Sequence, residues 1–395
     1  MRYTFSDCVL DTEEQTLTRS GVAVPVEPQV FDLLHVLAAN AGKLVNRDEI
    51  VDKVWDGRIV SESAISARIA AARKAVGDDG KAQRIIQTVS RRGFRLIAAN
   101  IEENLNTSGE FAVSKSTSFP KLRYAKAKDG TTLAYTVTGS GPPLVYVDFF
   151  PSDTLGAWEE PSERPLIDAL NARFTLVRYD QRGCGMSERD VERLDLDTVT
   201  EDLCVVADAA GVERFAIHAH SGACLTAIKF AARYPHRIRR MVLVGGYAEG
   251  RLRRGAHTGT ENEIFRTMVT EGWDKPRSAF IAAMMAAYMP EGPSDMVRSC
   301  AAFMQRNTTT HNELLDRDMI NNASVLDCLP RITAPTLVIN ARHDPVHPLG
   351  QGQKIAAGLP NAELLVYDTA NHVPIPGHRL WDRYVDDIMS FLSAD

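Results

Sequence analysis

The feature that most constrains the fold is a regular alternation of strand-like and helical segments after residue 121. Short runs rich in Val, Ile, Leu and Tyr are separated by longer stretches in which apolar residues recur at helical spacing. This alternation is typical of a mostly parallel sheet whose strands are joined by crossover helices, so we expect an α/β domain over residues 121–395. The strand-like runs are LAYTVTG, LVYVDFF, TLVRYD, RFAIHA, MVLVGG, TLVINA and ELLVYD.

A long insertion interrupts this alternation. Between MVLVGG and TLVINA, residues 249–333 show helical patterns and no strand-like run, so we expect them to form a helical cap over the sheet. Methionine and aromatic residues are frequent in this insertion. Most of them are expected to pack in a core, and the remainder to line an adaptable apolar pocket.

The first hundred residues are organised differently. Residues 3–26 contain short alternating runs broken by Glu, Gly and Pro, which predict a small antiparallel sheet. Three helical segments follow: one ends at Gly42, the second opens at Asn46 with the spacing of a capping box, and the third spans about residues 61–76. The run IIQTVSRRGFRLIA then predicts a hairpin.

A change in composition separates the two parts of the chain. Residues 99–120 are rich in Ser, Thr, Asn and Glu without a sustained period, which favours a linker. We therefore expect a multidomain protein, with an α+β domain over residues 1–98 followed by the α/β domain. At 44% hydrophobic and 24% charged residues, the composition allows a sizeable core in each domain.

Terminal and cysteine patterns exclude several classes of protein. The N-terminus lacks the basic start and apolar run of a signal peptide, and no stretch approaches the roughly 18 apolar residues that span a bilayer. We therefore expect a cytoplasmic protein without a membrane partner. The six cysteines are scattered without CxxC spacing, so we expect neither a disulfide framework nor a metal site, and no motif indicates a cofactor.

Positive charge is concentrated in one part of the first domain. The whole chain carries a net charge of −6, and residues 1–60 hold six basic against ten acidic side chains. Residues 61–98 hold eight basic against three acidic side chains. Because DNA binding requires cationic side chains that neutralise phosphates, this second part of the domain is where we expect DNA to bind.

The third predicted helix has an apolar stripe, formed by Ile65, Ile69, Ala72 and Val76, and a face of small polar residues opposite. Such a thin face fits a major groove, with serines at base edges and basic residues at phosphates. The alternative is that these side chains only form a solvated helix face. The residues expected to contact DNA are Ser63, Ser66, Arg73, Lys74, Arg91 and Arg92.

The order of sheet, three helices and hairpin, with the motifs VWDG, ARKAVGDDG and RRGFRL, resembles the OmpR/PhoB-type winged-helix domain that CadC-like regulators also carry. The resemblance covers residues 1–98. It implies binding of double-stranded DNA, and a homodimer that occupies paired half-sites.

The segment FAIHAHSGACL places Ser221 between a predicted strand and a predicted helix. A nucleophile elbow needs small residues two positions before and after the nucleophile, and Ala219 and Ala223 meet this need. Asp344 and His372 each follow a later predicted strand. The chain order Ser, Asp, His fits a triad in which His takes the serine proton and Asp orients the imidazole.

This order, together with YDQRGCGMS and FAARYPHRIRRMVLVGG, resembles the α/β-hydrolase family from about residue 122 onward. The resemblance implies an oxyanion hole formed by the backbone N–H of Gly222 and by the loop after the third strand. Where the family has His-Gly, this loop reads Asp148, Phe149, Phe150, with Phe150 the expected donor and Phe149 the second choice. The departure leaves two alternatives open: a working serine hydrolase, or a polar binding cluster without turnover.

The fusion of the two domains predicts a one-component transcriptional regulator. We expect the α/β-hydrolase domain to bind a small, partly apolar effector from the cytoplasm, such as an ester or lactone, and to hydrolyse it slowly or not at all. The alternative is an active serine esterase or lactonase with the winged helix as an accessory module. The residues expected to contact the effector are Phe149, Phe150, His220, Ser221, Met284, Tyr288 and His372.

Overall fold

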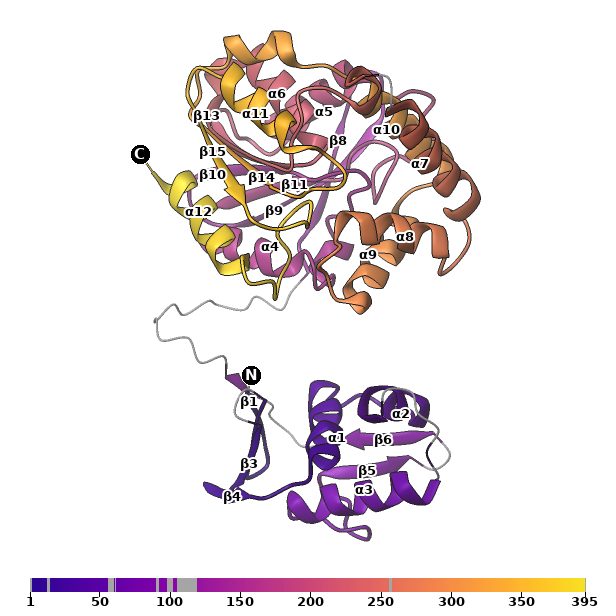
Figure 1. The fold of residues 1–395 in the computed structure, drawn as a ribbon. Coiled ribbons are helices and arrows are strands. Elements are labelled where there is room, and N and C mark those ends of the chain that lie inside the picture. Colours follow the sequence, from indigo (N-terminus) through magenta and orange to yellow (C-terminus); the bar gives the residue numbers. More distant parts are fainter. Residues whose placement is uncertain are drawn as a thin grey trace. The chain divides into compact units, whose positions relative to one another are not determined.

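The computed structural model divides the chain into two compact units, residues 1–112 and 113–395 (Figure 1). No helix in the described part of the chain is long and apolar enough to cross a membrane. The residues that the structure describes are 2–12, 15–55, 60, 62–89, 92–97, 102–104, 119–255 and 258–394.

The second unit is built on an eight-stranded, mostly parallel sheet, as the sequence predicts. Its strand order is β15-β14-β13-β12-β10-β11-β9-β8, in which β9 pairs with both β11 and β8 in the antiparallel direction and all other pairs are parallel. The strands are β8 (Leu122–Lys126), β9 (Thr132–Gly139), β10 (Pro143–Val147), β11 (Thr175–Tyr179), β12 (Phe215–His220), β13 (Ile238–Val244), β14 (Thr336–Ala341) and β15 (Ala362–Tyr367).

Helices cover both faces of this sheet. Strand residues such as Val145 and Ile217 pack against α5, α6 and α11, whereas their neighbours Leu144 and Ala216 pack on the opposite face against α4 and α12. This alternation follows from the two-residue period of a strand and explains why central strands such as β12 and β14 are buried on both faces. The helices are α4 (Arg164–Asn171), α5 (Leu196–Ala209), α6 (Ala223–Arg233), α11 (Leu349–Gly358) and α12 (Trp381–Ser393).

The segment between β13 and β14 is helical and has a small core of its own, rich in methionine, around Trp273 and Met304. Its helices gather beside one another at one end of the sheet (Figure 1). They are α7 (Thr258–Gly272), α8 (Ala279–Tyr288), α9 (Ser294–Asn307) and α10 (Thr310–Asn322). Short 3-10 helices complete the unit at Gly156–Trp158, Pro235–Arg237, Arg251–Arg253 and Leu326–Arg331.

Strand β8 was not predicted. It pairs only with β9, through the register Leu122 to Thr136, and forms the edge of the sheet. Its sequence LRYAK carries two basic residues, as edge strands often do, because charge discourages pairing with another chain. The pattern therefore lacks the apolar run that marks the interior strands.

The first unit is a winged helix. Its antiparallel sheet has the order β4-β3-β2-β1-β7. The linker prediction for residues 99–120 is wrong at residues 102–104, which pair with β1 because that strand offers an open hydrogen-bonding edge. The strands are β1 (Arg2–Phe5), β2 (Cys8–Asp11), β3 (Thr16–Arg19), β4 (Val22–Val24) and β7 (Glu102–Asn104).

Three helices and a hairpin complete this unit, and their apolar stripes bury one shared core. Asn46 Oδ1 accepts the Glu49 N–H at 2.9 Å, which confirms the predicted cap at the start of the second helix. The elements are α1 (Pro28–Ala39), α2 (Arg47–Trp55), α3 (Glu62–Ala75), β5 (Ile86–Val89) and β6 (Gly93–Leu96).

The hairpin requires glycine at residue 93. Its φ is 145°, and a Cβ there would lie 2.1 Å from Val45 O. Val45 and Phe94 exchange both of their backbone hydrogen bonds, at 2.8 and 2.9 Å. Gly93 thus allows the hairpin backbone to approach the segment before α2 closely.

Asp78 joins the end of α3 to the start of β5. The side chain is buried, and its two oxygens accept N–H groups from Asp79, Arg84, Ile85 and Ile86, each at 2.9 Å. Burial alone would raise the pKa of Asp78, but these four hydrogen bonds outweigh it and hold the pKa below its ordinary value.

We predict that Asp78→Asn destabilises the α3–β5 connection by about 2 kcal/mol or more, because an amide nitrogen would face two backbone N–H donors. Since the folded-state pKa is lowered, the stabilisation is present above the unfolded-state pKa and is lost as pH falls through the folded value. Hydrogen exchange of the Ile85 and Ile86 amides in the full chain measures this. Asp79→Asn is the control, because Asp79 is exposed and its Oδ1 can be retained as acceptor. Equal protection in both variants would contradict the prediction.

Candidate functional sites

Ser221, His372 and Asp344 form one hydrogen-bonded chain in the second unit. Ser221 Oγ lies 2.9 Å from His372 Nε2, and His372 Nδ1 lies 2.6 Å from Asp344 Oδ2. The three residues follow β12, β15 and β14, whose carboxyl ends share one edge of the sheet because the strands are parallel. This arrangement can move a proton from the serine to the imidazole.

The backbone at Ser221 makes a sharp turn between β12 and α6. Its φ is 50°, a conformation that side chains other than glycine rarely adopt, and its N–H donates to Val244 O at 2.8 Å. The small residues Ala219 and Ala223 on either side are both buried. The turn exposes the serine hydroxyl to a pocket, as a nucleophile elbow does.

Asp344 is held as a carboxylate. Burial would raise its pKa, but the nearby His372 and the N–H groups of Val346 and His347 outweigh burial and lower the pKa. Those two N–H groups donate to Asp344 Oδ1 at 2.8 and 3.0 Å, which leaves Oδ2 for His372. The carboxylate therefore fixes the orientation of the imidazole ring.

The loop after β10 is organised by a buried ion pair. Asp148 Oδ2 accepts from Arg178 Nη2 at 2.7 Å, and both side chains are almost fully buried. Asp148 Oδ1 accepts the Phe149 N–H at 3.0 Å, so this donor is already engaged. From this loop, Phe150 is therefore a better candidate than Phe149 for an oxyanion donor alongside Gly222.

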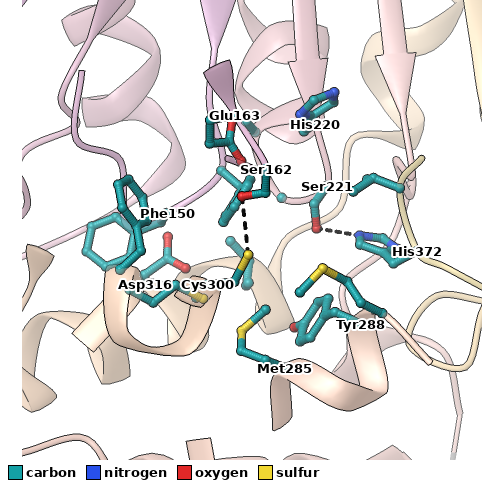
Figure 2. Close-up of a pocket in the computed structure, with 18 of the residues that line it drawn as sticks. Phe150, Ser162, Glu163, His220, Ser221, Met285, Tyr288, Cys300, Asp316 and His372 are labelled. Carbon is teal, nitrogen blue, oxygen red and sulfur yellow. Dashed lines mark hydrogen bonds between the residues drawn. The ribbon is translucent and has the colours of Figure 1, made fainter. Parts of the chain in front are cut away.

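The Ser221 hydroxyl opens into a pocket between the sheet edge and the cap (Figure 2). Its wall is mostly apolar. The apolar and aromatic lining residues include Phe149, Phe150, Leu166, Met285, Tyr288, Met289, Phe303, Met304, Ile320, Val373, Ile375 and Trp381.

Most of the residues predicted to contact an effector line this pocket, but Met284 does not. Met284 is buried in the cap core, where its sulfur accepts from Arg317 Nη2 at 3.3 Å, and the next residue, Met285, lines the pocket instead.

His220 lines the pocket, yet its two ring nitrogens pair with the hydroxyl groups of Tyr146 and Tyr384 at 3.0 and 2.8 Å. Only the ring carbons of His220 are therefore available to a ligand.

Sequence reasoning missed the ionisable residues of the pocket. Glu163 and three residues of α10, Glu313, Asp316 and Arg317, line it. Burial, together with the nearby Asp148, raises the pKa of Glu163 to about 8. The sequence pattern of α10 did not indicate that these residues line a pocket, because charged residues on an amphipathic helix are ordinarily assigned to the solvent face.

The first unit presents a small polar face on α3. Ser66 and Lys74 are exposed there, as is Arg92 in the hairpin. Ser63 lies on α3, but its side chain is outside the described part of the structure, and Arg91 is outside the described residues altogether.

The prediction that Arg73 contacts phosphate is wrong. Its side chain is buried, and its guanidinium donates to Ile86 O through Nε and Nη2, and to Thr88 Oγ1 at 2.8 Å. Arg73 therefore braces α3 against the hairpin. Helical spacing alone could not separate it from Lys74, because the two are neighbours at the edge of the exposed face.

Curated relatives match the second unit. A pyrrolizixenacetamide deacetylase from Xenorhabdus hominickii is 26% identical over 67% of this chain and 95% of its own length. A putative carbamate hydrolase RutD from Azorhizobium caulinodans is 28% identical over 64% of this chain and 91% of its own length.

Solved structures show the same fold. An enol-lactonase from Burkholderia xenovorans LB400 matches 69% of this chain and 100% of its own, with a TM-score of 0.55 and 24% identity. An esterase from Exiguobacterium antarcticum matches 69% of this chain and 99% of its own, with a TM-score of 0.59 and 19% identity.

Family models match both units. The model of the C-terminal domain of transcriptional regulatory proteins matches residues 21–96, over the helices and hairpin of the winged helix. The model of the α/β-hydrolase fold matches residues 142–378, which is more than half of the chain. The chain therefore belongs to the α/β-hydrolase fold family, fused to an OmpR/PhoB-type winged helix.

Proposed function

We propose that the protein is a DNA-binding transcriptional regulator whose α/β-hydrolase domain binds a small, partly apolar effector beside Ser221 and hydrolyses it slowly. The observation that carries the proposal is the hydrogen-bonded chain of Ser221, His372 and Asp344, which opens into an apolar pocket in a protein with a winged helix. Binding of the effector is the signal, and binding of DNA is the response.

In the proposed reaction, Ser221 Oγ attacks the acyl carbon of the effector while His372 Nε2 takes the serine proton. Asp344 stabilises the imidazolium that forms. The backbone N–H groups of Phe150 and Gly222 stabilise the negative oxygen of the tetrahedral intermediate. His372 then returns the proton to the leaving group, and water hydrolyses the acyl-serine.

Slow turnover is proposed because of the loop after β10. Phe149 and Phe150 stand where the family has a smaller turn, and the Phe149 N–H is engaged by Asp148. Phe150 is then the donor that this loop supplies, and the bulk of the two phenylalanines narrows the hole in which the oxyanion must meet it; loss of one such donor typically costs a factor of about 10² to 10³ in rate. A pocket with a complete nucleophile but a restricted oxyanion hole retains its ligand, which suits a sensor.

A ligand in the pocket would contact both the sheet edge and the cap. The His372 N–H donates to Tyr288 O at the end of α8, at 2.9 Å. The Glu291 N–H donates to Asn371 Oδ1 at 2.9 Å, so the cap is tied to the same loop a second time. We propose that the effector shifts the cap between two states with different affinities for it, and that a homodimer relays this difference to its winged helices.

We predict that Lys74→Gln and Arg92→Gln each weaken binding to the DNA upstream of the gene by about threefold to tenfold, and lower the slope of log affinity against log salt by about one. Fluorescence anisotropy over a salt series measures both quantities. Arg239→Gln, an exposed position of the second unit, makes the same change in net charge and is expected to bind like the parent protein. Identical salt slopes in all four proteins would refute the phosphate-contact assignment.

We predict that the full chain hydrolyses p-nitrophenyl butyrate and that Ser221→Ala lowers kcat/KM by about 10³ or more, since the nucleophile is lost. Ser390→Ala, at an exposed serine of α12, should retain full activity. A footprint on upstream DNA that shifts with ligand and persists in Ser221→Ala would support the regulator. Turnover lost in Ser221→Ala without any footprint would instead support a serine esterase or lactonase whose winged helix is accessory.

A further inference from the structure

Helix α10 places ionisable groups against the pocket. Glu313, Asp316 and Arg317 occupy positions i, i+3 and i+4, so they share one helix face, and all three are buried. That face continues to Ile320, and a Cβ on Gly222 would lie 3.4 Å from Ile320 Cγ2. The charged face of α10 therefore adjoins the turn that carries Ser221.

Two of these three side chains form an ion pair with each other. Arg317 Nη2 donates to Glu313 Oε1 at 2.8 Å, and both residues are more than nine-tenths buried. The pair is neutral as a whole, which is the form in which buried charges are usually tolerated. One acidic side chain of the helix face remains outside this pair.

Asp316 is that side chain. It is only 6% exposed, and no hydrogen bond to its carboxyl group is found within the described residues. Figure 2 shows the carboxyl group projecting into the pocket, on the side where Phe150 lies and away from His372. Burial raises the pKa of Asp316 well above its ordinary value, the charge of Glu313 raises it further, and Arg317 opposes both.

Among the described residues that line the pocket, no cation is paired with this carboxyl group. Its lining contains the carboxyl groups of Glu163, Glu313 and Asp316 against the single guanidinium of Arg317, which is already paired. A buried carboxyl group without a partner is costly, so such a group in a pocket points to a ligand that supplies the partner. In the empty pocket the raised pKa favours the neutral acid; a protonated amine supplies both a hydrogen-bond donor and the opposite charge, and so stabilises Asp316 as a carboxylate, which a neutral donor does less well.

We propose that the effector carries a protonated amine that binds Asp316, joined by an apolar body to the acyl group that lies at Ser221. The apolar body packs against side chains between the two ends, among them Met285, Phe303 and Ile320. This inference rests on the proposed function, because it takes the pocket at Ser221 as the effector site. It narrows the effector from a partly apolar acyl compound to an amine-bearing one.

The test compares ligands that differ only in charge at one end. Anilides of ω-amino acids with four to eight carbons are each paired with the neutral anilide in which a methyl group replaces the ammonium, such as 6-aminohexananilide and heptananilide. Isothermal titration of the full chain measures their dissociation constants. We expect the amino anilide of the matching length to bind at least about tenfold more tightly than its neutral partner.

Two variants assign the preference to Asp316. Asp316→Asn should abolish it, while heptananilide binds this variant as well as or better than the parent protein, which also shows that the pocket is folded. Asp318→Asn is the matched control, since Asp318 lies on the same helix, is exposed and pairs with Arg266. It should retain the full preference.

The outcomes separate this inference from the proposed function. Binding of the neutral anilides without any amine preference at any length, or a preference that persists in Asp316→Asn, overturns the amine site alone. If no anilide of either series binds and p-nitrophenyl butyrate is not hydrolysed, both the amine site and the effector pocket are overturned.

Discussion

The functional part of the second unit depends on the parallel pairing of β10, β12, β13, β14 and β15. Because their carboxyl ends share one edge, the loops that follow them meet even though Ser221 and His372 are 151 residues apart in the chain. The strand order reverses between β10 and β12, so the connections leave toward opposite faces of the sheet and open a crevice there. Phe150 and Ser221 border that crevice from the two adjacent strands.

The cost of burying charge organises both units. Asp148 with Arg178, and Glu313 with Arg317, are buried ion pairs within a loop and a helix face. In the winged helix, the buried Arg73 donates instead to backbone and hydroxyl oxygens. Charged side chains without such a protein partner are the ones that indicate where a ligand or DNA binds. In the proposed function, the exposed basic residues of α3 and the hairpin contact phosphates, and the carboxyl group of Asp316 on α10 binds a cationic ligand.

The cap and the proposed triad are physically joined. Tyr288 accepts a backbone hydrogen bond from His372, so the end of α8 and the loop after β15 form one structure. An effector held between Ser221 and α10 would contact both the cap and the loops at the end of the sheet. The contacts that orient the effector for attack by Ser221 would then also shift the cap between its two states. One site could therefore both sense the effector and hydrolyse it slowly.

The sequence by itself determined seven of the eight strands of the second unit, the helical faces of the winged helix, and the order of Ser221, Asp344 and His372, because each is a local pattern of side-chain type and spacing. Only the tertiary structure decided which side of each helix faces the core, the pocket or the solvent. It placed Arg73 and Met284 inward and exposed Lys74, and it added the polar edge strands β7 and β8. It also turned the charges of α10 toward the pocket, because burial depends on the elements packed around a helix, and those come from distant parts of the chain.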